Sequence, residues 1–222
     1  MTFKEFRKST GEEIAKTIFI SLLTSTITLA ILYFIKLNKV ENFIPKYGFF
    51  IFFSALSFAI LAPAIKQVRS YKEFPCMSGM MIGMTIGMIS GFLSAFYVGS
   101  TNGMFWGSVL GMAVGIYFGI VNGKCCGIMG IMEGIMAGFM GSLMGGMTAV
   151  MTLNDNLKYI AVIIFLVCSI IMLGLNYMIY KESEQLERKI KEGQIYTIIT
   201  TFIFIVVVAW FIVYGPRSAL FG

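Results

Sequence analysis

The apolar residues of this chain are gathered into seven long blocks separated by short polar stretches. Each block holds about twenty residues, the length of an α-helix that crosses a hydrocarbon core of about 30 Å. The pattern therefore predicts an all-α, polytopic membrane protein, a bundle of about seven transmembrane helices in a lipid bilayer. The predicted spans are Ile14–Ile35, Tyr47–Ala64, Met77–Val98, Met104–Val121, Gly127–Met151, Tyr159–Tyr180 and Tyr196–Val213.

The basic residues predict how the bundle is oriented. With the N-terminus in the cytoplasm, the inner segments hold 12 of the 17 lysines and arginines and the outer segments hold 5. An excess of basic residues on the cytoplasmic side is the rule for membrane proteins. We therefore expect a protein of a bacterial or archaeal plasma membrane, with its N-terminus inside and its C-terminus outside. The first block is too long for a cleavable signal peptide and is predicted to be a retained anchor.

The composition narrows the possible chemistry. The chain is 58% hydrophobic and 13% charged and contains no histidine, which excludes a histidine general base, a Ser-His-Asp triad and histidine-ligated zinc or haem. No other catalytic constellation is recognisable, so we expect no enzyme. The net charge of +6 follows from the cytoplasmic excess of basic residues and does not indicate a nucleic-acid partner. The charged segment Lys181–Gln194 is predicted to be a solvated helical extension.

Glycine and methionine divide the chain into three parts. Residues 76–151 hold 18 of the 24 glycines and 14 of the 17 methionines. Residues 1–75 and 152–222 are instead rich in Ile, Leu, Phe and Val, as lipid-facing helices are. We therefore predict a three-helix inner module over 76–151, wrapped by two outer helices from 1–75 and two from 152–222.

Within this module, small residues recur at every fourth position. Such a register leaves a flat groove along a helix, and neighbouring backbones can approach closely in lipid. The register crosses two predicted loops, 99–103 and 122–127, so it predicts a hairpin followed by a third helix. A weak repeat at an offset of 51 residues predicts that the first and third of these helices run in the same direction. The register is Gly79, Gly83, Gly87, Gly91, Ala95, Gly99, Gly103, Gly107, Gly111, Gly115, Gly119, Gly123 and Gly127, then Gly130, Gly134, Gly138, Ser142 and Gly146.

The methionines form two helical stripes. On the fifth predicted helix they lie within about 60° of Glu133 at 100° per residue, and the glycines occupy an adjoining sector. Glu133 lies six residues into that helix, and intramembrane carboxylates usually face a bundle interior or a wet cavity. It is therefore expected to be a coupling or charge-balancing group, or else a protonated, hydrogen-bonded packing residue or an acid that snorkels to the inner interface. The stripes comprise Met77, Met80, Met81, Met84 and Met88, then Met129, Met136, Met140, Met144, Met147 and Met151.

Thioethers are soft, neutral ligands that suit Cu(I). Met77, Met80, Met84 and Met88, with Met129, Met136 and Met140, form a candidate path for that ion. Cys76, Cys125 and Cys126 are predicted at the cytoplasmic end and form its candidate acceptor, with palmitoylation or a structural role as open alternatives. Cys168 is expected to be a packing residue. If the path exists, the sulfurs of Met84 and Met136 should face each other or a common cavity. Methionine also fills irregular gaps beside glycine grooves, so packing remains an open alternative.

The pair Met80-x-x-x-Met84 among Gly-x-x-x-Gly repeats resembles the signature of the small trimeric copper importers. The likeness covers about 75 residues; this chain has seven predicted spans rather than three and no Met-rich extracellular tail. The resemblance implies only that Met80 and Met84 line a copper path. Cys125-Cys126 is similar to the vicinal cysteines of bacterial mercury uptake proteins.

Two functional hypotheses follow. In the first, the protein transports or handles a soft cation, Cu(I) before others, through methionine and cysteine ligands; no phosphate-binding loop is present, so transport would be passive, gradient-coupled or dependent on a partner. In the second, glycine zippers on several faces build a homo-oligomer, a channel or a scaffold, or dock a membrane partner protein, and the sulfur has no metal role.

Overall fold

The computed structural model describes residues 3–35, 47–70, 74–124, 127–153, 156–183 and 194–215. Within these ranges the chain forms seven α-helices and no strand, which confirms the predicted all-α bundle. All seven are long and apolar enough to cross a bilayer, so the chain is an integral membrane protein by length and composition. The helices are α1 (Phe3–Ile35), α2 (Phe49–Ser70), α3 (Cys76–Asn102), α4 (Met104–Gly123), α5 (Gly127–Met151), α6 (Leu157–Ser183) and α7 (Gln194–Tyr214).

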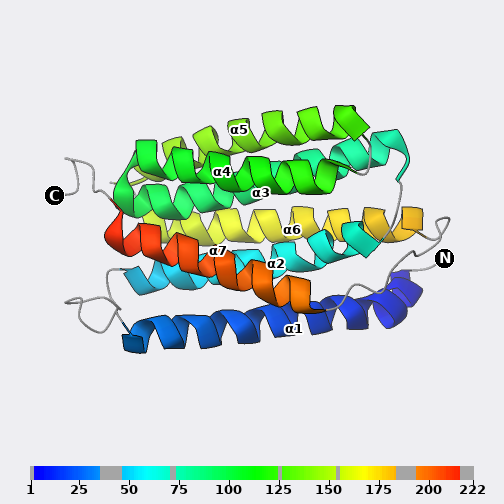
Figure 1. The fold of residues 1–222 in the computed structure, drawn as a ribbon, viewed down its shortest axis with the longest axis horizontal. Coiled ribbons are helices and arrows are strands. Elements are labelled where there is room, and N and C mark those ends of the chain that lie inside the picture. The colour runs from blue at the N-terminus through cyan, green and yellow to red at the C-terminus, as the bar shows by residue number, and fades with distance from the viewer. Residues whose placement is uncertain are drawn as a thin grey trace.

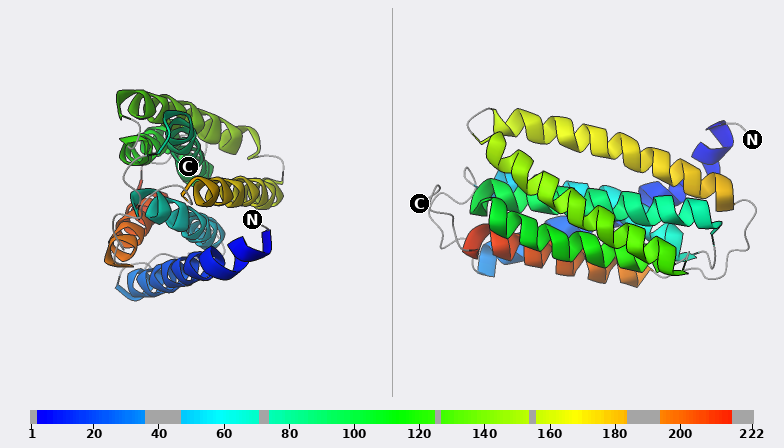
Figure 2. Two further views of the ribbon diagram at one scale, coloured as in Figure 1. Left: turned by 90° about the vertical axis from the view of Figure 1, so that its right-hand side faces the viewer. Right: turned by 90° about the horizontal axis from the view of Figure 1, so that it is seen from above.

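The helices lie side by side along one long axis in three layers (Figure 1). Helices α3, α4 and α5 form one side, α2, α6 and α7 lie in the middle, and α1 forms the opposite edge (Figure 2). The start of α1 and the end of α7 lie at opposite ends of the bundle, as an odd number of spans requires (Figure 1). We call these the Cys76 end, where α3 begins, and the Gly103 end, where α3 turns into α4.

Several helices extend beyond the predicted spans, and α1 begins at Phe3 rather than at Ile14. Helix α3 continues to Asn102, and the predicted loop 99–103 shrinks to Gly103, whose φ of 88° favours glycine. Helix α2 passes through Pro63 and ends at Ser70, so Lys66 lies inside the helix. Hydropathy marked the end of the apolar block, whereas the helical backbone continues beyond it. Of the predicted extension 181–194, the structure describes only residues 181–183 and 194.

The glycine register brings α3, α4 and α5 together backbone against backbone, and these three pairs of helices are the most closely packed in the molecule. A methyl group on Gly87 would lie 2.9 Å from the carbonyl oxygen of Gly134 and 3.2 Å from the Cα of Gly119. One turn away, a methyl group on Gly91 would meet Gly138 O and Gly115 Cα in the same way, at 2.8 and 3.3 Å. Each layer thus takes one small residue from each helix.

These layers also fix the direction of the helices. The contacts advance in step along α3 and α5, from Gly87 with Gly134 to Gly91 with Gly138. The prediction that these two helices run in the same direction is therefore confirmed, and α4 runs opposite to both.

The expected wrapping of this module by the other helices is wrong. Helix α3 is central, with 72% of its best membrane window buried, but the value is only 39% for α4 and 33% for α5. Helix α5 packs on α3 and α4 and has at most marginal contact with the remaining helices. The physical reason is that the small-residue faces of the three helices pack against one another. Helix α5 therefore has no further small-residue face on which another helix could pack.

Candidate metal-binding face

Helix α5 has two chemically distinct sides. Its small residues, including Gly134, Gly138 and Ser142, are buried against α3 and α4. Its methionines lie on the opposite side and are exposed: Met129, Met132, Met136, Met140, Met144, Met147 and Met151. The predicted segregation of sulfur from glycine is therefore present, with the sulfur turned away from the module.

Helix α3 carries the second stripe. Met77, Met81, Met84 and Met88 are exposed, and Met80 is half-buried. A methyl group on Gly141 of α5 would lie 3.0 Å from the Cα of Met88. Because Met140 and Met144 flank Gly141 on α5, the two stripes meet beside this contact. We call the exposed methionines of α3 and α5 together the sulfur face.

The expected enclosed path between Met84 and Met136 is wrong for a single chain. Met84 is 41% exposed and Met136 is 61% exposed, so neither sulfur is enclosed in the bundle. The reason lies in the packing: the glycines of α3 and α5 bury one side of each helix against the other helices of the module, and the exposed methionines lie outside that contact. Six of the seven predicted methionine ligands are therefore exposed on an outer surface, namely Met77, Met84, Met88, Met129, Met136 and Met140, and Met80 is half-buried.

Glu133 shares this surface. It was expected to face the bundle interior or a wet cavity, but it is exposed among the methionines of α5. It makes no hydrogen bond or ion pair with the described residues. Six residues from the start of α5, it lies about 9 Å along the helix. A carboxylate at that depth costs free energy when it faces acyl chains unless it reaches the interface or meets another polar group.

The cysteines are only partly described. Cys76 is exposed at the first residue of α3. Cys125 and Cys126 lie outside the described residues. The residues on either side of them, Gly123 and Gly127, belong to the same end of the module, because Gly83 of α3 packs on Gly123 and Gly130.

Cys168 of α6 is half-buried against the hydrophobic core, as expected of a packing residue. Within the described ranges, no three Cys, Asp or Glu side chains are grouped as a metal site.

One polar contact near Cys76 was not found from the sequence. The hydroxyl of Ser78 donates a hydrogen bond to Oε1 of Glu182, which joins α3 to α6 at the Cys76 end. The second carboxylate oxygen of Glu182 is buried and has no hydrogen-bond partner within the described structure. The two residues are 104 positions apart, and a serine inside the apolar block of α3 was the available signal.

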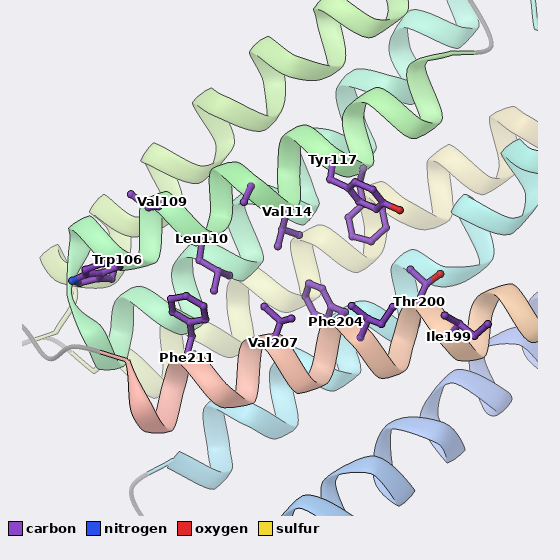
Figure 3. A pocket seen from close by; sticks show the side chains of 13 residues that line it. Trp106, Val109, Leu110, Val114, Tyr117, Ile199, Thr200, Phe204, Val207 and Phe211 are labelled. Carbon is purple, nitrogen blue, oxygen red and sulfur yellow. The ribbon is translucent and has the colours of Figure 1, made fainter.

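A groove between α4 and α7 was also missed. It has a volume of about 530 Å³ and an almost wholly apolar lining. Side chains of both helices point into it along most of their length (Figure 3). None of the residues predicted as metal ligands lines it.

Comparison with family models, curated proteins and solved structures finds no match to this chain. The class that the fold defines is therefore an integral membrane helical bundle with a glycine-packed trio of helices and an outward sulfur face.

Proposed function

We propose that this membrane protein handles a soft cation, Cu(I) before others, at sites that form where its sulfur face meets the same face of a second copy. The observation that carries the proposal is the outward position of the methionines together with Glu133, on the side of α5 opposite its glycines. The location inferred for the sites is thus intermolecular rather than inside one chain.

The positions of the methionines weaken the packing explanation. Methionine that serves as a flexible filler should occupy gaps between helices. In this molecule the grooves of α3, α4 and α5 are filled by neighbouring backbone, with groups such as Gly134 O and Gly119 Cα next to Gly87. The exposed sulfurs fill no gap within the chain, so their role lies outside it.

A second copy would complete the set of ligands around the cation, which one chain provides only in part. Thioethers on one exposed face offer a cation ligands from one side only, whereas two facing stripes surround it with soft donors. The same contact would remove Glu133 from the acyl chains and place its negative charge beside the bound cation, which offsets the cost of burying the carboxylate. Cys76, with Cys125 and Cys126, would then take the cation from the weaker thioethers at that end of the module.

The test is the silver and copper(I) content of the purified protein in nanodiscs. Silver is a soft monovalent cation like Cu(I), but it does not undergo air oxidation. We expect the triple change Met136→Leu, Met140→Leu and Met144→Leu to remove most of the bound silver and to weaken the oligomer formed in its presence. The control adds three methionines to another exposed surface of the parent protein, with Leu166→Met, Ile170→Met and Leu173→Met on α6. Unchanged silver binding in the α5 variant, or an equal gain in the α6 variant, would contradict the proposal.

The alternative is an assembly role without metal, and its mechanism differs from the one first expected. The zipper glycines are used within one chain, so they leave little for an oligomer contact. The sulfur face itself is the better candidate, because methionine adapts readily to a partner surface. An oligomer that forms equally well without metal and binds no silver would favour this function.

A further inference from the structure

The groove between α4 and α7 runs lengthwise along the bundle. It begins at Trp106 near the Gly103 end and reaches Tyr117 on α4, and it runs from Phe211 to Ile199 on α7 (Figure 3). At 1.5 Å per residue, these stretches are about 17 and 18 Å long. That length is close to one leaflet of a hydrocarbon core of about 30 Å, and the volume of about 530 Å³ lies in the range of ligand pockets.

Aromatic side chains make the floor of this groove. The rings of Phe204 and Phe118 line it from the two sides, and behind them Phe58 of α2 stacks on Phe204 at 4.5 Å and lies 5.9 Å from Phe118. Helices α4 and α7 are thereby held apart by a rigid aromatic wedge instead of closing on each other. The groove is thus maintained by packed side chains of the bundle, and it opens on the lipid-facing surface.

A cationic side chain, that of Lys66, lies beyond the end of the groove that is nearer to the Cys76 end of the bundle. Thr200 lines both the groove and a small cavity that is also lined by Thr197 and Lys66. Lys66 follows Phe58 by about two turns of α2, whereas Thr200 precedes Phe204 by one turn of α7. Lys66 therefore lies past the groove, toward the Cys76 end.

The ammonium of Lys66 is weakly compensated. It is half-buried and donates a hydrogen bond of 3.3 Å to the hydroxyl of Thr17 on α1, its one partner within the described ranges. Lys16 precedes Thr17, and Arg69 follows Lys66 by one turn of α2. A half-buried positive charge in a membrane protein is costly when its one described partner is a hydroxyl group. The small cavity that Lys66 lines next to the groove therefore favours an anion.

We propose that the groove binds a bilayer phospholipid with an anionic head group, with one acyl chain between α4 and α7 and the phosphate beside Lys66 and Thr197. The apolar slot accounts for the chain, and the cation at its end accounts for the head group. The site is independent of the sulfur face, because it lies on other helices and shares no residue with it. An anionic lipid at this position would tie α2, α4 and α7 together.

The test uses fluorescence quenching by brominated lipids. Trp106 lines the groove, and the second tryptophan of the chain can be removed with Trp210→Phe. The protein is reconstituted in vesicles of brominated phosphatidylglycerol or brominated phosphatidylcholine, diluted with the unbrominated lipid. We expect the anionic lipid to quench Trp106 with a relative affinity about fivefold higher, the contribution of one lysine near a membrane surface.

Two variants and a control separate the parts of the proposal. Lys66→Gln should abolish the preference for the anionic lipid, and Val114→Phe should reduce quenching by both lipids because it fills the groove. Lys158→Gln, an exposed lysine at the Gly103 end, should change neither. Equal quenching by the two lipids in the parent protein, or a preference that survives Lys66→Gln, would overturn the proposal. Efficient disulfide cross-linking of two copies through Val207→Cys would also overturn it, because a second chain would then occupy the groove.

Discussion

Helices α5 and α6 both expose a long face at the surface of the bundle, yet the two faces have different chemistry. The exposed residues in the middle of α6 are branched aliphatic: Val162, Ile163, Leu166, Val167, Ile170 and Ile171. The exposed face of α5 is mainly methionine and includes Glu133. Contact with acyl chains is sufficient to explain the face of α6. It does not account for the methionines and the carboxylate on α5, and this difference supports the proposed intermolecular role.

The two helices are also attached to the bundle by different means. Helix α5 is held by backbone contact through Gly138 and its equivalents. Helix α6 is held by side chains, among them Phe165, which packs edge-on against Phe53 at 5.6 Å, and Met172, which is 1% exposed. The same bilayer environment thus accommodates two modes of packing, and each predicts a different sensitivity to substitution.

The largest expected effect is that of enlarging a glycine on α5. Gly138→Leu should destabilise the protein by at least about 3 kcal/mol, since even a methyl group would lie 2.7 Å from the carbonyl oxygen of Gly115. On α6, a methyl group on Gly174 would meet nothing within 4 Å and the residue is exposed, so the matched change Gly174→Leu should be tolerated. Thermal unfolding in detergent measures both. Similar losses in the two variants would show that the backbone packing of α5 is not special.

Next in size is the removal of a buried methionine. Met172→Ala on α6 should cost about 2–4 kcal/mol, because it leaves a cavity in the core. Met136→Ala on α5 should change the free energy of unfolding by less than about 0.5 kcal/mol, because its side chain is exposed. These measurements are made on the metal-free protein. A large loss for Met136→Ala would mean that the sulfur face is part of the folded core.

A smaller effect is expected at the polar contact between α3 and α6. Ser78→Ala removes the hydrogen bond to Glu182 and should cost about 1 kcal/mol. Ser169→Ala is the control, because its hydroxyl bonds only to the carbonyl oxygen of Phe165 in its own helix. Hydrogen exchange of the end of α6 provides a local measurement. Equal exchange in both variants would argue against a role for Ser78 in holding α6.

The smallest effect on stability belongs to the triple leucine variant of Met136, Met140 and Met144. Metal-free, it should unfold within about 0.5 kcal/mol of the parent, since leucine replaces methionine at exposed sites with little change in volume. Added silver should stabilise the parent and have a much smaller effect on this variant, because a ligand stabilises the folded state in proportion to how strongly it binds. Equal stabilisation of both would place the silver site elsewhere.

The sequence by itself determined the local properties of this protein. Apolar length defined seven helices, and the four-residue register of small residues identified α3, α4 and α5 as helices that pack closely, with α3 and α5 in the same direction. Angular positions on α5 separated glycine from methionine correctly. Each of these follows from spacing along one helix or from the order of neighbouring helices.

The tertiary structure alone decided what each face meets. In a membrane protein both buried and lipid-facing residues are apolar, so hydropathy cannot tell the inside of the bundle from its outside. The outward turn of Met84 and Met136, the position of α5 at one side, the contact of Ser78 with Glu182 and the groove ending near Lys66 all depend on pairings between distant segments. Those pairings are set by the fit of whole helix surfaces, which no local pattern encodes.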